Sequence, residues 1–216
     1  MDTMRGSLFY DRRDAGKKLA TILKKENLED AVILALPRGG VVVADEVAKV
    51  LHLPMEVVIA RKIGAPGHPE YGIGALSENS IPSFNSSVQG YFDLSSPAIR
   101  ATIQDETEEL KRRIELYRHG NALPDMKDKK VIIIDDGLAT GATAVAAAKF
   151  LRTLHPKELI LAVPVGPSDV GRDVEESYDR IICPHALANL RGVGLWYDNF
   201  DQVEDEEVLE ILQTYH

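Results

Sequence analysis

Two kinds of hydrophobic pattern alternate along this 216-residue chain. Continuous apolar runs, rich in Val, Ile and Leu, predict strands at 31–36, 53–63, 129–135, 157–166 and 179–184. Segments in which apolar residues recur every three to four positions predict helices at 14–26, 41–51, 95–120, 143–154, 169–178 and 204–215. The strands are apolar throughout rather than alternating in polarity. This pattern therefore indicates an α/β fold, with a central parallel sheet and helices on both faces.

The boundaries of the long helix 95–120 are marked by local signals. Ser95 or Ser96 is the expected N-cap, Pro97 fits the first turn, and Gly120 is expected to end the helix. The segment 65–80 is instead rich in Gly and Pro, so it predicts a loop or a loose hairpin.

Composition narrows the class of protein. Hydrophobic residues make up 44% and charged residues 27%, an ordinary globular balance. The formal net charge of −9 disfavours broad binding to nucleic acids or anionic membranes. Cys183 is the one cysteine, which excludes an internal disulfide and is typical of a reducing compartment. With no apolar signal core and no membrane-length apolar run, the chain is expected in the cytoplasm. The histidines show no zinc-ligand spacing.

The stretch VIIIDDGLATGAT, residues 131–143, carries the strongest chemical signal. Asp135 and Asp136 fall at the carboxyl end of a buried strand, where parallel sheets place their ligands. Two adjacent carboxylates can accept hydrogen bonds from neighbouring hydroxyls, such as a ribose diol. They can also help to position a hydrated magnesium ion. The simpler alternative is an ordinary turn.

The loop after the acidic pair has the features of a phosphate site. Gly137 and Gly141 allow close backbone approach, and Thr140 and Thr143 supply hydroxyls. The helix that begins here directs its positive end toward a bound anion. A diol site beside a phosphate site matches a ribose 5-phosphate, whereas Thr143 as a plain N-cap is the alternative. The chain contains no GxxxxGK[ST] motif, so a nucleoside-triphosphate loop does not explain the pattern.

Two further turns carry cations. Arg38 precedes Gly39 and Gly40 between a strand and a helix, and this turn can offer a guanidinium and backbone N–H groups to a diphosphate. Arg61 and Lys62, placed after strand 55–60, can neutralise a leaving pyrophosphate. The glycines and prolines of the following segment, 64–76, suit a mobile loop that closes over a reaction.

These motifs together resemble type I phosphoribosyltransferases, which use 5-phosphoribosyl-1-pyrophosphate (PRPP). VIIIDDGLATGAT resembles the family's PRPP signature, ALPRGGVVVADEVAKVL its pyrophosphate loop, and ARKIGAPG the mobile catalytic loop of adenine-type members. The segments DRRDAGKKLA and GLWYDNF and the acidic C-terminal helix resemble an uncharacterised branch of predicted phosphoribosyltransferases. The resemblance implies a single domain over 1–216. Its core would span about 28–183, and a small hood would come from the N-terminal and C-terminal segments.

The resemblance also implies roles for individual residues. Arg38, Gly39, Gly40, Arg61 and Lys62 would bind and neutralise pyrophosphate, and a non-proline cis peptide is expected at Arg38–Gly39. Asp135 and Asp136 would hold the ribose, and would hold Mg²⁺ indirectly, through water or PRPP. The remaining substrate-binding residues would be Gly137, Ala139, Thr140, Gly141, Ala142 and Thr143. PRPP, pyrophosphate and a small-molecule base are the expected ligands, and a homodimer is the expected assembly.

The acceptor is less defined. Hypoxanthine-guanine enzymes carry an aspartate base at the loop position occupied here by Ala139, which favours an adenine-type pattern. Trp196 either stacks on a base or anchors the C-terminal segment to the core. The alternative function is a non-catalytic PRPP-sensing regulator, although the basic pairs of the chain are interspersed with acids. A PRPP-forming diphosphokinase would need a nucleotide site and a duplicated domain, and the sequence shows neither.

Overall fold

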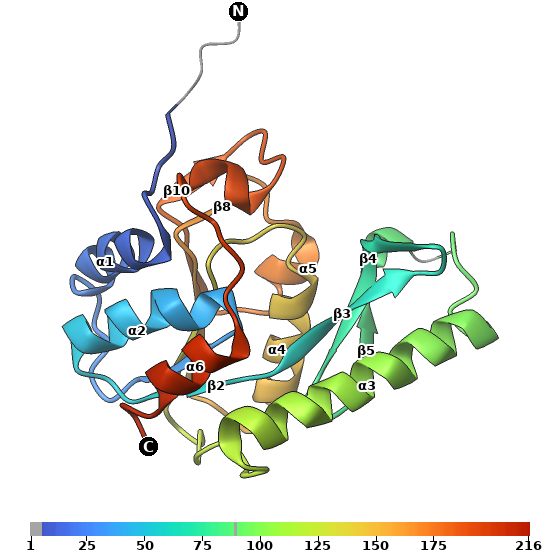
Figure 1. Ribbon diagram of the computed structural model, residues 1–216, viewed down its shortest axis with the longest axis horizontal. Helices are drawn as coiled ribbons and strands as arrows, with labels where there is room; N and C mark the ends of the chain where they lie inside the picture. The colour runs from blue at the N-terminus through green and yellow to red at the C-terminus, as the bar shows by residue number, and fades with distance from the viewer. Residues whose placement is uncertain (1–5, 89) are drawn as a thin grey trace, which may run out of the picture.

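A five-stranded parallel sheet forms the centre of the computed structural model, which describes residues 6–88 and 90–216. Its strands are β1 (Val32–Ala35), β2 (Met55–Val57), β6 (Lys130–Ile134), β7 (Glu158–Ala162) and β9 (Arg180–Ile182). They lie in the order β2-β1-β6-β7-β9, and every pairing is parallel. The predicted α/β class is therefore confirmed (Figure 1).

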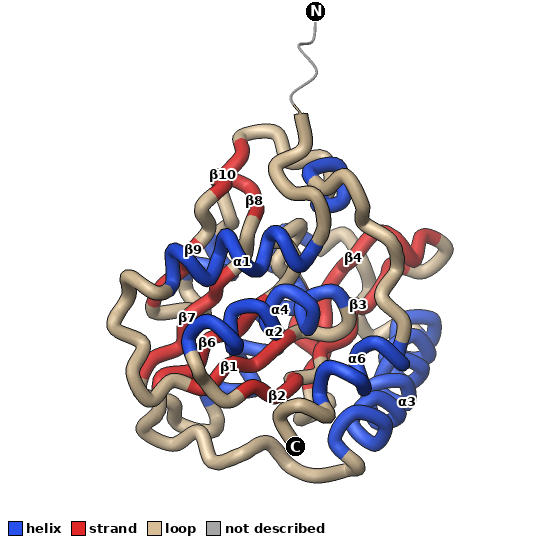
Figure 2. Tube along the Cα trace, turned by 60° about the vertical axis from the view of Figure 1, so that its left-hand side comes forward, coloured by secondary structure: helices blue, strands red, loops and turns tan. Residues whose placement is uncertain are grey.

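Helices cover both faces of this sheet. On one face lie α1 (Arg12–Leu23) and α2 (Gly39–Leu51), in front of the strands in Figure 2. On the other lies α4 (Ala142–Arg152), with the short α5 (Arg172–Glu175) beside it. Alternate residues of β6 enter the two cores, with Ile132 on the α2 side and Ile133 on the α4 side. This two-sided burial explains why the strands are apolar throughout.

A second, antiparallel sheet stands beside the first. It consists of β3 (Ala60–Ala65), β4 (His68–Ser77) and β5 (Pro82–Phe84), and it packs against α3 (Pro97–Arg118) and α4. The prediction of one strand over 53–63 was therefore wrong, because β2 ends at Val57 and the chain enters the other sheet at Ala60. The segment 65–80, predicted as a loop or loose hairpin, contains the turn that follows β3 and the whole of β4.

Helix α3 begins and ends close to the predicted signals. Ser96 is the N-cap, its Oγ accepting from the Ile99 N–H at 3.4 Å, and Pro97 is the first helical residue. The helix ends at Arg118, followed by His119 and Gly120 in left-handed conformation (φ 51° and 72°). Ser96 rather than Ser95 is thus the cap.

The C-terminal part of the chain is less regular than predicted. The run 157–166 is divided into β7 and β8 (Val165–Pro167), and β8 pairs in parallel with β10 (His185–Leu187). Two short 3-10 helices, η1 (Ser86–Val88) and η2 (Val193–Trp196), complete the elements together with α6 (Asp205–Leu212). The predicted helix 169–178 was too long, since only α5 forms there.

Candidate active site

The acidic pair follows β6 at the carboxyl edge of the central sheet. Asp135 Oδ1 accepts a hydrogen bond from the Asp136 backbone N–H at 2.8 Å, and Asp136 Oδ2 accepts one from Arg12 Nε at 2.7 Å. Burial raises the pKa of both carboxyl groups. The neighbouring Asp136 charge adds to the rise at Asp135, and the Arg12 guanidinium opposes it at Asp136. One oxygen of each carboxylate is therefore engaged within the protein.

The Arg38–Gly40 turn packs directly on this pair. A Cβ at Gly39 would overlap Asp136 Oδ2 and lie 2.6 Å from Arg12 Nε. A Cβ at Gly40 would lie 2.8 Å from the Ile134 carbonyl oxygen and 2.9 Å from Asp135 Cα. Real Cβ atoms do not approach this closely, so only glycine fits at these two positions without displacement. The turn after β1 and the turn after β6 therefore meet in one place.

The non-proline cis peptide lies one bond earlier than expected. It joins Pro37 to Arg38, and the predicted bond, Arg38–Gly39, is not cis. The cis bond still falls in the turn between β1 and α2, so the prediction had the correct loop and the wrong peptide.

The loop 137–143 leads from the acidic pair into α4. Gly141 has φ 73° and occupies the N-cap position, and its carbonyl accepts the helical hydrogen bond from Val145 N–H at 2.8 Å. Ala139 and Thr140 are exposed. The Leu138 N–H donates to the Val165 carbonyl at 2.9 Å, which fixes the loop to the start of β8. The loop thus leads from the carboxylates to an exposed threonine and the N-terminus of α4.

The expected pyrophosphate cations have acidic partners. Arg38 Nη1 lies 3.3 Å from Glu204 Oε2 and 3.6 Å from Asp205 Oδ1, both of the C-terminal segment. Arg61 Nε lies 2.7 Å from Glu106 Oε2 of α3. These two arginines are therefore joined to two different parts of the molecule.

Arg61 and Lys62 lie within β3 rather than after a strand, which corrects their predicted setting. Successive strand residues project to opposite faces of a sheet, so the two side chains do not form one adjacent pair of cations.

The N-terminal and C-terminal segments, which were predicted to form a hood, lie side by side. The Leu8 and Phe9 N–H groups both donate to the Trp196 carbonyl, at 2.9 and 3.1 Å. The half-buried Trp196 side chain packs in a small apolar cluster with Phe9 and Tyr197, and its buried indole N–H has no hydrogen-bond partner among the described residues. The Tyr197 hydroxyl donates to the Asp136 carbonyl at 2.5 Å. The segment around Trp196 therefore contacts the acidic pair.

Arg12 is a residue of the site that was not predicted from the sequence. It lies 124 residues before Asp136 in the chain, so no local motif connects them. The predicted helix began only at residue 14, so the sequence pattern carried no signal at Arg12; in the structure Arg12 is the first residue of α1, where the positive end of the helix disfavours a cation. Such a position calls for a specific partner, which here is Asp136.

A metal ion would need ligands beyond the protein. Among residues 6–88 and 90–216, no group of three or more His, Cys, Asp or Glu side chains could hold one. Asp135 and Asp136 are oxygen donors of the kind that Mg²⁺ prefers, so these two residues fit an ion that is also held by a substrate.

The one cysteine of the chain offers little reactivity. The pKa of the half-buried Cys183 thiol is raised to about 11 by burial, which makes it a poor nucleophile at neutral pH.

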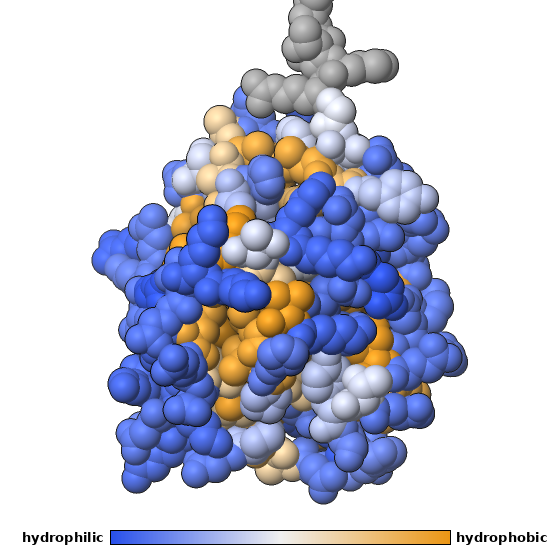
Figure 3. Space-filling view, turned by 90° about the vertical axis from the view of Figure 1, so that its left-hand side faces the viewer, coloured by the Kyte–Doolittle hydropathy of each residue, from blue (hydrophilic) through white to orange (hydrophobic). Residues whose placement is uncertain are grey.

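In the described part of the chain, no helix is both long and apolar enough to cross a bilayer. Hydrophilic side chains dominate the face that carries α1 and α2, with smaller apolar areas between them (Figure 3).

Comparisons with known proteins agree with this arrangement. The family model for the phosphoribosyl transferase domain matches residues 9–198. A Mycobacterium tuberculosis protein named "Putative phosphoribosyl transferase MT0597" is 39% identical over 209 residues, which is 97% of this chain and 47% of that protein. The chain thus spans about half the length of this relative. The "Bifunctional protein PyrR" of Clostridium acetobutylicum is 26% identical over 182 residues, which is 80% of each chain.

A solved structure is also similar along the whole chain. TT1426 from Thermus thermophilus has 36% sequence identity and a TM-score of 0.78, covering 96% of this chain and 98% of its own. The family match includes the turn after β1, the acidic pair and the loop before α4, and the Mycobacterium relative extends it over nearly all of the sequence. From these matches and the geometry of its sheet edge, the chain belongs to the phosphoribosyl transferase family.

Proposed function

We propose that the protein transfers the 5-phosphoribosyl group of PRPP to a nitrogen nucleophile and releases pyrophosphate. One observation supports this above the others. Gly39 and Gly40 pack against Asp135 and Asp136, so a turn suited to a diphosphate adjoins carboxylates suited to a ribose diol. PRPP carries both groups on neighbouring carbons of its ribose.

Each part of the edge has a role in this reaction. Asp135 and Asp136 accept hydrogen bonds from the ribose hydroxyls and stabilise positive charge that develops on the ring. The loop 137–143 binds the 5-phosphate through its backbone N–H groups, hydroxyls and the positive end of α4. The N–H groups of the Gly39–Gly40 turn bind the pyrophosphate. The protein thereby orients the substrates and neutralises charge.

The cations act by exchanging partners. Exposed ion pairs typically contribute only about 0–1 kcal/mol, so a multiply charged pyrophosphate can displace Glu204 from Arg38. Arg61 would leave Glu106 in the same way. Because Arg61 and Lys62 project to opposite faces of β3, we propose that movement of the β3–β4 hairpin brings one of these two cations to the leaving group.

Magnesium is the expected cofactor. Asp135 and Asp136 would hold the ion indirectly, through water or the ribose hydroxyls, and when bound it supplies positive charge that stabilises the departing pyrophosphate. A homodimer and a cytoplasmic location stay predictions.

The acceptor is expected to be adenine or a smaller heterocycle. Ala139 offers no group that could take a proton from an oxopurine, and general-base help is typically worth ~10²–10⁴-fold in rate. Efficient turnover of guanine or hypoxanthine would contradict this part of the proposal. Trp196→Ala tests the hood: a loss of stability with unchanged affinity for the base would assign Trp196 to the apolar core alone.

The experiment that tests the function is a pyrophosphate-release assay. Purines, pyrimidines and related heterocycles are each supplied with saturating PRPP and Mg²⁺. The Asp135→Asn/Asp136→Asn variant should retain its fold and lose both PRPP binding and release. A matched control is Asp30→Asn/Asp128→Asn, which removes two exposed charges before β1 and β6, at the opposite edge of the sheet. Unchanged PRPP affinity in the first variant would refute the assignment.

The acidic partners of Arg38 and Arg61 favour a second candidate, a PRPP-sensing regulator that binds without turnover. Calorimetric binding of PRPP with no pyrophosphate release from any acceptor, together with RNA or DNA binding, would identify it.

A further inference from the structure

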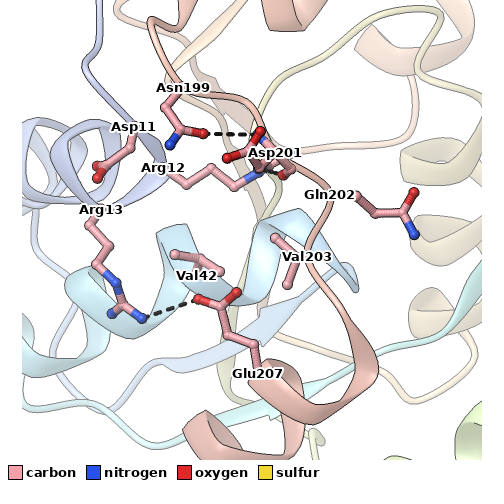
Figure 4. Close-up of a pocket in the computed structure, with 9 residues that line it drawn as sticks. All are labelled: Asp11, Arg12, Arg13, Val42, Asn199, Asp201, Gln202, Val203 and Glu207. Atoms are coloured by element: carbon pink, nitrogen blue, oxygen red, sulfur yellow. Dashed lines mark hydrogen bonds and ion pairs between the residues drawn. The ribbon is translucent and has the colours of Figure 1, made fainter.

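Arg12 is held at three points. Its Nε lies 2.7 Å from Asp136 Oδ2, and its Nη1 donates to the Asp201 carbonyl at 2.7 Å. Its guanidinium carbon stands 3.8 Å from the centre of the Phe200 ring. Figure 4 shows the side chain extending from α1 toward the C-terminal segment. Only 11% of it is exposed, so this arginine is fixed in one orientation.

The stability of α1 does not explain an arginine at this position. The helix is capped by Asp11, whose side chain accepts from the Asp14 N–H at 2.8 Å. A cation in the first turn faces the positive end of the helix, and burying it adds a desolvation cost. An apolar residue could pack on Phe200 without either penalty. The feature that requires a guanidinium is the Asp136 carboxylate.

We infer that Arg12 is a positioning residue, which holds the Asp136 carboxylate with one oxygen engaged and the other directed to the ribose of PRPP. This role rests on the proposed function. Because Gly39 has no side chain, the Arg12–Asp136 pair lies directly against the pyrophosphate turn. The Tyr197 hydroxyl donates a hydrogen bond to the Asp136 carbonyl and so holds the backbone of the same residue. Arg12 thus acts on the substrate through Asp136 rather than by touching it.

The next residue supplies a matched control. Arg13 carries the same charge in the same helical turn, and its partners are Asp45, Glu46 and Glu207, at 3.3 to 3.5 Å. Figure 4 shows it turned toward Glu207 rather than toward Asp201. Arg13→Gln therefore removes an equal charge from the protein and leaves the Arg12–Asp136 contact intact.

The test is a calorimetric titration of PRPP with Mg²⁺ into the full chain. Arg12→Gln removes a hydrogen bond to a charged group, so this variant should bind PRPP about 10- to 100-fold more weakly than the wild type. Arg12→Lys, which keeps the charge, should recover part of the loss. Arg13→Gln should stay within about 2-fold of the wild type, as expected for a substitution that changes no contact in the site.

A double-mutant cycle then separates positioning from general structure. If Arg12 acts through Asp136, Arg12→Gln/Asp136→Asn should bind PRPP no more weakly than Asp136→Asn alone. Thermal unfolding of each variant checks the fold. Arg12→Met, which keeps the alkyl stem against Phe200, replaces the glutamine variant if that one unfolds.

Three outcomes would overturn the inference. Unchanged PRPP affinity in Arg12→Gln would show that the guanidinium is not needed. Equal losses in the wild-type and Asp136→Asn backgrounds would show that Arg12 does not act through Asp136. Failure of the wild-type protein to bind PRPP would instead refute the proposed function, and this role with it.

Discussion

Gly39→Ala is the substitution that best tests the contact between the two turns. The new Cβ would overlap Asp136 Oδ2 and approach Arg12 Nε to 2.6 Å. Both obstacles are ends of flexible side chains, so they can swing aside while the backbone of the turn stays in place. The expected damage is thus to the orientation of the carboxylate rather than to the fold.

The magnitude follows from the interactions that must change. Displacing the Arg12–Asp136 pair removes a charged hydrogen bond worth about 1.5–3 kcal/mol, and alanine at a helical position returns about 0.5–1 kcal/mol relative to glycine. The net loss of about 1–2 kcal/mol corresponds to a Tm lower by roughly 2–8 °C in a chain of this size. PRPP affinity should fall by about 10- to 100-fold, because the ribose loses a correctly placed acceptor.

Gly40→Ala is the comparison that separates the two effects. Its Cβ would meet backbone atoms, the Ile134 carbonyl oxygen at 2.8 Å and Asp135 Cα at 2.9 Å, which cannot rotate away. Overpacking of this kind typically costs about 1–3 kcal/mol and moves the backbone. Calorimetric Tm and PRPP titration of both variants provide the assay. If Gly39→Ala binds PRPP as tightly as the wild type, the two turns do not form one site and the reasoning fails.

Three further outcomes are expected. Glu204→Gln should leave Arg38 with only Asp205 as its acidic partner and tighten the binding of inorganic pyrophosphate by up to about 5-fold, with no change in Tm; weaker binding in calorimetry would count against the partner exchange. Arg118→Met should leave Glu78 buried and unpaired and lower the free energy of unfolding by about 3–5 kcal/mol at pH 8. Burial already raises the pKa of Glu78. A carboxyl group whose pKa is higher in the folded than in the unfolded state makes the protein less stable as pH increases. The loss in free energy of unfolding caused by Arg118→Met should therefore be smaller near pH 5 than at pH 8, as measured by urea unfolding. A loss that does not depend on pH would be inconsistent with this cause. Residues 64–76 should exchange amide hydrogens faster without PRPP than with it, and strong protection in both states would argue against a closing hairpin.

The central sheet was predictable because its signal is local. Each strand enters two cores, so an apolar run such as Val131–Ile134 marks it without reference to the rest of the chain. The break inside 53–63 was not predictable in this way. Val57, Val58 and Ile59 are all buried, and their sequence reads as one strand. The chain changes sheet where the Ile59 N–H donates to Glu78 and the Ile59 carbonyl accepts from Ser77, both distant in sequence.

The same difference between local and distant sequence signals applies to the candidate site. Asp135, Asp136 and the loop to Thr143 are contiguous, so one motif located them together. Arg12 comes from another part of the chain, and its role depends on how α1 packs beside the sheet. The acidic partners of Arg38 and Arg61 were equally unpredictable, since Glu204 immediately precedes α6 and Glu106 lies in α3, and no periodicity determines where these helices pack.

The hydrogen bonds between the two ends of the chain have a consequence for biosynthesis. Leu8 and Phe9 bond to Trp196, and the Asn199 N–H bonds to the Tyr10 carbonyl at 2.8 Å. A ribosome adds about 5–20 residues per second, so the acidic pair emerges several seconds before the segment that secures Arg12. A nascent chain that stops short of Trp196 would contain the whole phosphate loop and still lack its support. Under the proposed function, PRPP binding would require synthesis at least through Asp201, and products truncated before it would not compete for the substrate.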